Sequence, residues 1–113
     1  MTSPQEVRWR LRHGTRIVGY ERTLGRHTWF SRDGFWWNGG PLAFTEKDRW
    51  TGWKDRHNRW LYEWDVVDIQ DKPGPWFLGW NGDDWELRRP HIRLIARPYR
   101  SSMIRVGYNF PLK

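Results

Sequence analysis

Short segments that alternate apolar and polar residues recur along the chain, with turn residues between them. Residues 7–12 show the pattern best, because three apolar side chains alternate there with three arginines. This period of two is typical of a strand, and helical periodicity is almost absent. Asn81-Gly82 is the strongest hairpin signal. The pattern predicts an all-β, mainly antiparallel fold of the kind found in small barrels.

Turn residues set the limits of the expected elements. We expect strands over residues 7–12, 16–24, 27–31, 35–37, 61–70, 76–80, 85–88, 91–96 and 103–106. Residues 71–75, Asp-Lys-Pro-Gly-Pro, are expected to form a loop. Thr45 is a candidate helix cap, so residues 45–48 are expected to form at most one short helical turn.

Tryptophan contributes much of the apolar side-chain area from which a core could form. The chain has 113 residues, which suits a single domain, and only 37% of them are hydrophobic. Eleven are tryptophan, and each buried tryptophan removes about 200 Å² from water. At about 25 cal/mol per Å², a few of them hold a small barrel together. We expect about half of the tryptophans to be buried.

Charge is distributed unevenly. Residues 1–32 carry a net charge of +5, residues 33–87 carry −5 and residues 88–113 carry +7. Sixteen of the twenty basic residues are arginine, which binds phosphate in a fork and stacks on aromatic rings. A phosphate-bearing partner is one interpretation. The other is that the basic ends pair with the acidic middle, within one chain or between subunits.

Arginines interleaved with aromatic residues are the main candidates for ligand binding. The expected phosphate-binding residues are Arg8, Arg10, Arg12, Arg88, Arg89, Arg93, Arg97, Arg100 and Arg105. Arg93 and Arg97 have the even spacing that places them on one strand face. The expected stacking residues are Trp29, Trp36, Trp37, Trp76, Trp80 and Trp85.

Several other classes of protein are disfavoured. There is no cysteine, which fits a reducing cytoplasm and excludes a disulfide framework. The N-terminal twelve residues contain no signal-peptide pattern, and no segment is long and apolar enough to span a membrane. The four histidines lack metal-ligand spacing, and the serines sit in no nucleophile motif. We therefore expect no enzyme activity, no metal and no cofactor.

Residues 50–67 read Trp-Thr-Gly-Trp-Lys-Asp-Arg-His-Asn-Arg-Trp-Leu-Tyr-Glu-Trp-Asp-Val-Val, and this stretch resembles the signature of the YopX family of small phage and prophage proteins. The residues that match in type are Thr51, Gly52, Lys54, Asp55, Tyr62, Glu63, Asp65 and Val67. Asn58 stands where the family has glycine, and it tolerates a left-handed conformation. Trp64 stands at another family glycine. If that position requires positive φ, Trp64 is strained there.

The resemblance implies a phage protein of the host cytoplasm that forms oligomers. It also implies an SH3-like barrel over residues 49–113, preceded by N-terminal strands over residues 1–48. The family has no established biochemical role to transfer. The chemistry of the motif is mostly that of turns.

Glu63 and Asp65 lie two residues apart and point to the same side of an extended strand. Lys54, Arg56 and Arg59 are their expected partners. A catalytic carboxylate pair is the alternative for Glu63 and Asp65, but no nucleophile or metal set lies near them in the sequence.

Three functional hypotheses follow, and the third is an enzyme. The first is a non-enzymatic binding protein that holds nucleic acid or a small nucleotide through arginine and tryptophan. The second is an oligomeric protein–protein interaction module that modulates a host factor. The sequence does not identify the ligand, the partner or the oligomer number.

Overall fold

The computed structural model describes residues 5–111, so the first four residues of the segment considered for a signal peptide lie outside it. The all-β, mainly antiparallel class is confirmed. The chain divides into two compact units between Trp50 and Thr51, an N-terminal unit and a C-terminal unit. Among the described residues, no helix is long and apolar enough to cross a membrane.

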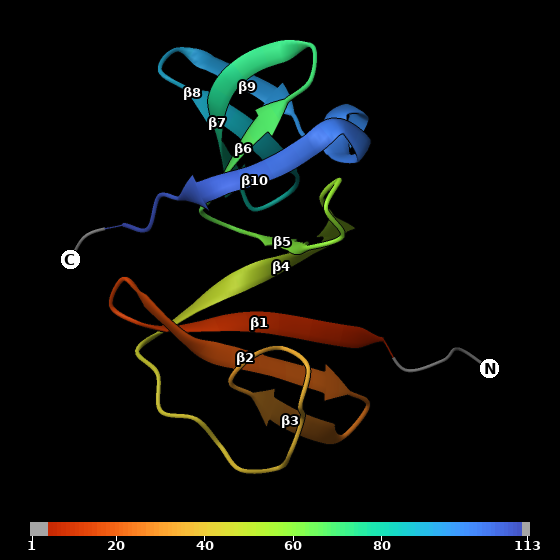
Figure 1. Ribbon diagram of the computed structural model, residues 1–113, viewed down its shortest axis with the longest axis vertical. Helices are drawn as coiled ribbons and strands as arrows, with labels where there is room; N and C mark the ends of the chain where they lie inside the picture. The colour runs from red at the N-terminus through yellow and green to blue at the C-terminus, as the bar shows by residue number, and fades with distance from the viewer. Residues whose placement is uncertain (1–4, 112–113) are drawn as a thin grey trace. The chain divides into compact units, whose positions relative to one another are not determined.

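Ten strands and one 3₁₀ helix make up the described structure (Figure 1). The elements are β1 (Glu6–His13), β2 (Arg16–Leu24), β3 (His27–Ser31), β4 (Glu46–Lys54), β5 (Trp60–Tyr62), β6 (Asp65–Ile69), β7 (Lys72–Trp80), β8 (Trp85–Arg89), β9 (Ile92–Ile95), η1 (Arg97–Ser102) and β10 (Met103–Tyr108). One sheet has the order β3-β2-β1-β4-β5 and the other the order β10-β6-β7-β8-β9.

Three expectations about local structure are wrong. Residues 45–48 form no helical turn, because β4 begins at Glu46 and pairs with β1, while the Thr45 hydroxyl accepts a hydrogen bond from the Gly14 N–H. Residues 35–37 lie in a loop, where Asp33 binds the backbone and stops β3 from continuing. Residues 72–75 belong to β7, since Lys72 pairs with Ile69 of β6.

The N-terminal unit is built around a buried ion pair network on β1. The Arg10 Nε donates to the Asp48 carboxylate at 2.8 Å, and the Arg12 guanidinium contacts both oxygens of Asp48 at 2.8–2.9 Å. Arg10 and Asp48 are both 0% exposed. Asp48 is the cross-strand partner of Arg10, so register alone brings the two side chains to one face.

This network corrects the expectation that the arginine face of residues 7–12 is open to a ligand. β1 lies between β2 and β4, and Arg10 and Arg12 are almost wholly excluded from solvent, so they are interior side chains. Leu11, on the opposite face of β1, is also 0% exposed. Both faces of the strand are therefore buried at this point.

The C-terminal unit holds the apolar core. The buried cluster consists of Leu61, Val67, Ile69, Trp76, Leu78, Trp85, Leu87, Ala96 and Met103. Of the eleven tryptophans only Trp76 and Trp85 are buried, eight are half-buried, and Trp36 is exposed. The expectation that half are buried is wrong, because aliphatic side chains fill most of this core.

A closed SH3-like barrel is not confirmed. In the second sheet, β6 to β9 follow one another as antiparallel neighbours, and β10 returns to pair with β6. β9 and β10 stand at the two ends of the strand order, so this sheet is open. Figure 1 shows η1 as a short coil between β9 and β10.

Asp55 organises the turn of the motif. Its carboxylate accepts hydrogen bonds from the backbone N–H groups of His57, Arg59 and Arg105, and from the Arg59 Nε. Burial raises the pKa of Asp55, but these hydrogen bonds and the charge of Arg59 outweigh it, so the pKa lies below its ordinary value. Asn58 has a φ of 64°, the left-handed conformation expected for this turn.

Trp64 adopts a φ of 76°, so the position does require positive φ. Its N–H donates to the Leu78 carbonyl at 3.0 Å and its carbonyl accepts from the Asn109 N–H at 2.8 Å. Next to it, the buried Asp65 accepts from the Tyr62 N–H and lies 4.0 Å from the Arg105 guanidinium. These contacts hold a backbone conformation that costs about 1–2 kcal/mol for a non-glycine residue.

We predict that Asp48→Ala lowers the free energy of unfolding by about 3–5 kcal/mol, because it leaves two buried guanidinium groups without their shared carboxylate. Arg97→Ala is the control, since its pair with Asp84 is long, at 3.6 Å, and exposed. We expect that change to cost less than about 1 kcal/mol. Urea unfolding measures both variants. A loss below about 1 kcal/mol for Asp48→Ala would contradict a stabilising role for the network.

The lowered pKa of Asp55 predicts a pH dependence. Its contribution to stability is present above the ordinary aspartate pKa of about 3.9 and is lost as pH falls through the lower, folded-state value. Asp55→Asn should therefore be less stable than wild type at pH 7, and the difference should shrink below about pH 4. Thermal unfolding from pH 7 to pH 2 measures this difference. A gap that is constant across that range argues against ionisation as the cause.

Candidate ligand-binding hollow

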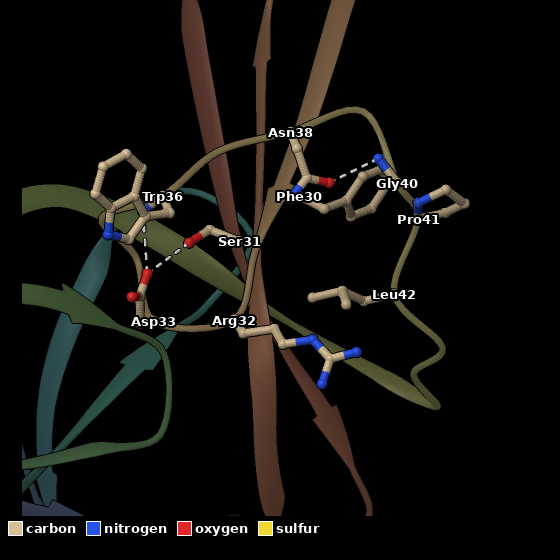
Figure 2. Close-up of a pocket in the computed structure, with 9 residues that line it drawn as sticks. All are labelled: Phe30, Ser31, Arg32, Asp33, Trp36, Asn38, Gly40, Pro41 and Leu42. Atoms are coloured by element: carbon tan, nitrogen blue, oxygen red, sulfur yellow. Dashed lines mark hydrogen bonds between the residues drawn. The ribbon is translucent and has the colours of Figure 1, made fainter.

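A hollow of about 470 Å³ lies in the N-terminal unit where the chain leaves β3 (Figure 2). It is lined by Phe30, Ser31, Arg32, Asp33, Trp36, Asn38, Gly40, Pro41 and Leu42. Its volume falls within the range of about 300–1,000 Å³ typical of small-molecule sites. Aromatic and aliphatic walls with a few polar groups are also typical of such sites.

Asp33 shapes one side of the hollow. Its Oδ1 accepts hydrogen bonds from the N–H groups of Phe35 and Trp36 and from the Ser31 hydroxyl. The two backbone bonds lower the pKa of Asp33, so this carboxylate is ionised at neutral pH. Gly34 completes the turn with a φ of 87°, as the Asp33-Gly34 pair predicts.

The other side of the hollow is held by long-range contacts. Phe30 and Asn38 exchange two backbone hydrogen bonds, at 2.7 and 3.0 Å, which close the loop between them. The Asn38 side-chain oxygen accepts from the Gly40 N–H. Leu42 packs over Gly19, where an added Cβ would lie 2.4 Å from its Cδ1. A larger residue at position 19 would push Leu42 away.

The rim carries both an aromatic face and a cation. Trp36 is 82% exposed, and its neighbour Phe35 is 84% exposed. Arg32 is exposed, and its guanidinium has no partner among residues 5–111. Figure 2 shows Trp36 and Asp33 on one side, Pro41 and Leu42 on the other, and Arg32 below them. The arrangement offers stacking for a flat ring and a contact for an anion.

Alternating arginine and tryptophan side chains lie on the sheet beside this loop. The Arg8 guanidinium is 5.4 Å from the Trp37 ring and 5.7 Å from the Trp50 ring. Arg22 lies 5.7 Å from the Trp29 ring and 6.0 Å from the Trp37 ring. Trp37 therefore sits between two cations and ties the loop to the sheet.

Glu6 balances these two arginines. It forms ion pairs with Arg8, at 2.9 Å, and with Arg22. Burial raises the pKa of Glu6, but the hydrogen bonds and charges of the two arginines outweigh it and leave the pKa below its ordinary value. Arg8, Trp29 and Trp37 are thus already engaged within the protein.

Most of the C-terminal candidates also have internal contacts. The Arg89 guanidinium lies 4.1 Å from the ring of buried Trp76 and donates to the carbonyls of Pro73 and Pro75. Arg105 donates to the Trp60 carbonyl and pairs with Asp65. Trp80 packs against buried Trp85, with ring centroids 5.2 Å apart.

Four C-terminal arginines keep accessible guanidinium groups. Arg88 is half-buried and pairs with Glu86, whereas Arg93, Arg97 and Arg100 are exposed. The expectation that Arg93 and Arg97 share a strand face is wrong, because β9 ends at Ile95 and Arg97 begins η1. Proline at the start of η1 favours that turn over a longer strand.

Two ion pairs of the motif were not predicted. Arg59 binds Asp55 at 2.9 Å, and Asp65 lies 4.0 Å from the guanidinium of Arg105, which is outside the motif. Within residues 5–111, no three His, Asp or Glu side chains are grouped so that they could hold a metal ion.

Several residues of the hollow were not predicted from the sequence. Phe30, Arg32, Asn38 and Leu42 line it but were not among the candidates. Part of the loop could be recognised from its turn residues. Asp33-Gly34 predicts the turn, and Asn38-Gly39-Gly40-Pro41 is rich in turn residues. Leu42 and Gly19 are distant in sequence, so no local pattern predicts their contact.

Comparison with models of known protein families, with curated proteins and with solved structures finds no match. The resemblance of residues 50–67 to the YopX signature therefore stays a prediction.

Proposed function

We propose that the protein is a non-enzymatic binding protein that holds a phosphate-bearing ligand, a nucleotide or nucleic acid, in the hollow beside Trp36. The observation that carries this proposal is the pairing of an exposed tryptophan face with an unpartnered arginine on one rim. Stacking of a base on an aromatic side chain contributes about 1–3 kcal/mol. Arg32 supplies the anion contact, since a guanidinium binds phosphate through a fork of donors.

The rest of the rim fits such a ligand. Phe30, Pro41 and Leu42 give apolar walls for a planar ring. The Asn38 amide nitrogen has no partner among the described residues and can donate to a ring oxygen or nitrogen. The loop is fixed before binding by Asp33 and by the bridge from Phe30, so little ordering free energy is lost on association.

Membership of the YopX family, with a phage origin and a place in the host cytoplasm, is part of the same proposal. Two observations support it: residues 50–67 match the signature in type, and Trp64 has the positive φ suited to the family's glycine. The order of the second sheet, four successive strands, a 3₁₀ turn and a fifth strand beside the first, supports the SH3-like architecture.

The second candidate is an oligomeric protein–protein module that modulates a host factor. Phe35 and Trp36 favour it, because two adjacent large aromatic side chains are more than four-fifths exposed. Such residues are frequent anchors of protein interfaces. A dimer that dissociates in the Phe35→Ala, Trp36→Ala double variant, measured by sedimentation, would favour this function over ligand binding.

The test is a fluorescence and calorimetric titration of the full chain at about 50 mM salt. The probes are the four ribonucleoside monophosphates and a twelve-nucleotide oligothymidylate. Trp36→Ala should weaken binding of the best probe roughly tenfold or more, since it removes the stacking face. Arg32→Ala should weaken binding and lower the salt dependence, since it removes one phosphate contact.

Arg26→Ala is the matched control, because Arg26 is an exposed arginine of the same unit that does not line the hollow. It should leave the affinity within about twofold. The proposal fails if no probe binds wild-type protein under these conditions. It also fails if Trp36→Ala and Arg26→Ala bind the best probe equally well.

A further inference from the structure

Two arginines occupy paired positions on neighbouring strands of the second sheet. Arg88 of β8 and Arg93 of β9 are cross-strand partners. Leu87 and Leu94, which flank them, point to the core, so Arg88 and Arg93 project from the opposite, outer face. Like charges directly opposite each other destabilise a sheet. Their placement therefore has a cost that anions bound at this face would offset.

The Arg88 guanidinium is held in place by its surroundings. It lies over Gly79 of β7, where an added Cβ would clash with three of its atoms. Its Nε donates to Glu86 at 2.9 Å. No other partner of Arg88 is present among residues 5–111, so its two terminal nitrogens keep their donors for a ligand. This side chain is preorganised rather than mobile in solvent.

Arg93 adds a second charge with no carboxylate of its own. It is exposed and makes no hydrogen bond or ion pair with the described residues. Glu86 is the acid nearest to the pair, and it is engaged by Asn81, at 2.8 Å, and by Arg88. The Asn81 hydrogen bond and the Arg88 contacts lower the pKa of Glu86, with a smaller effect from Arg93. One carboxylate thus faces two guanidinium groups.

An aromatic ring continues the row. Phe77 of β7 is the cross-strand partner of Arg88 on this outer face, and it is half-buried rather than part of the core. The row Phe77, Arg88 and Arg93 runs across three adjacent strands. Bases stack both on aromatic rings and on the planes of arginine guanidinium groups.

We propose that this outer face of β7, β8 and β9 binds a single-stranded nucleic acid, with backbone phosphates on Arg88 and Arg93 and a base against Phe77. The site is an open sheet face rather than a pocket, which suits a polymer better than a small anion. Two cations against one acid give the charge complementarity. This site is separate from the hollow and does not depend on the function proposed for it.

Fluorescence anisotropy of labelled twelve-nucleotide oligothymidylate tests the site in the full-length protein over a range of salt concentrations. Arg93→Ala should weaken binding about fivefold or more and reduce the slope of log K against log salt by about 0.7, the value for one single-strand phosphate contact. Phe77→Leu should weaken binding threefold or more without changing that slope. Both variants should keep the wild-type melting temperature to within a few degrees.

Arg56→Ala is the matched control, since Arg56 is an exposed arginine of the same unit outside this face. It should change neither the affinity beyond twofold nor the slope. Equal losses for Arg93→Ala and Arg56→Ala, or no binding of oligothymidylate at about 50 mM salt, overturn the proposal. Competition by inorganic phosphate at concentrations below about 1 mM would also overturn it, because such competition would show that the site binds small anions. If Trp36→Ala weakens oligothymidylate binding and Arg93→Ala does not, the ligand binds in the hollow and the proposal for the outer face is wrong.

Discussion

The buried contact of Arg10 and Arg12 with Asp48 is the constraint on which the N-terminal unit depends. It joins β1 to β4 across 36 or 38 residues, and all three side chains are almost wholly excluded from solvent. Removing one partner of a buried ion pair lowers the free energy of unfolding far more than removing one partner of a surface pair. The register it fixes also places Glu6, Arg8 and Trp50 on one face, where Arg8 meets Trp37 of the loop that forms the hollow.

The structure divides the arginines by role. One group is engaged internally: Arg10 and Arg12 hold Asp48, Arg89 covers Trp76, and Arg105 pairs with Asp65. These pairs join basic end segments to the acidic middle of the chain, one of the two interpretations of the charge pattern. The second group, which includes Arg32 and Arg93, is exposed and unpartnered among the described residues. We propose ligand contacts for Arg32 at the hollow and for Arg93 beside Arg88 on the outer face.

Local patterns predicted most strands but not which of their faces are buried. The alternation in residues 7–12 identified β1 correctly, yet Arg10 and Arg12 were expected to face solvent. Their burial depends on Asp48, which reaches them only through the pairing of β1 with β4. Similarly, Asp33-Gly34 predicted a turn, whereas the hollow also needs Leu42 over Gly19. The positive φ of Trp64, 76°, could not be predicted from local pattern, since tryptophan rarely adopts this conformation.

The central claim is that Arg32 and Arg93, which are exposed and lie at the two proposed sites, bind the ligand, while buried arginines hold the fold. NMR of the arginine Nε–H and tryptophan indole N–H groups during titration with oligothymidylate tests it most directly. The signals of Arg32, Arg93 and Trp36 should move with added ligand, and those of Arg10 and Arg12 should stay in place. Equal movement of Arg10 and Arg12, or saturation of binding while Arg32, Arg93 and Trp36 remain unchanged, would contradict the account.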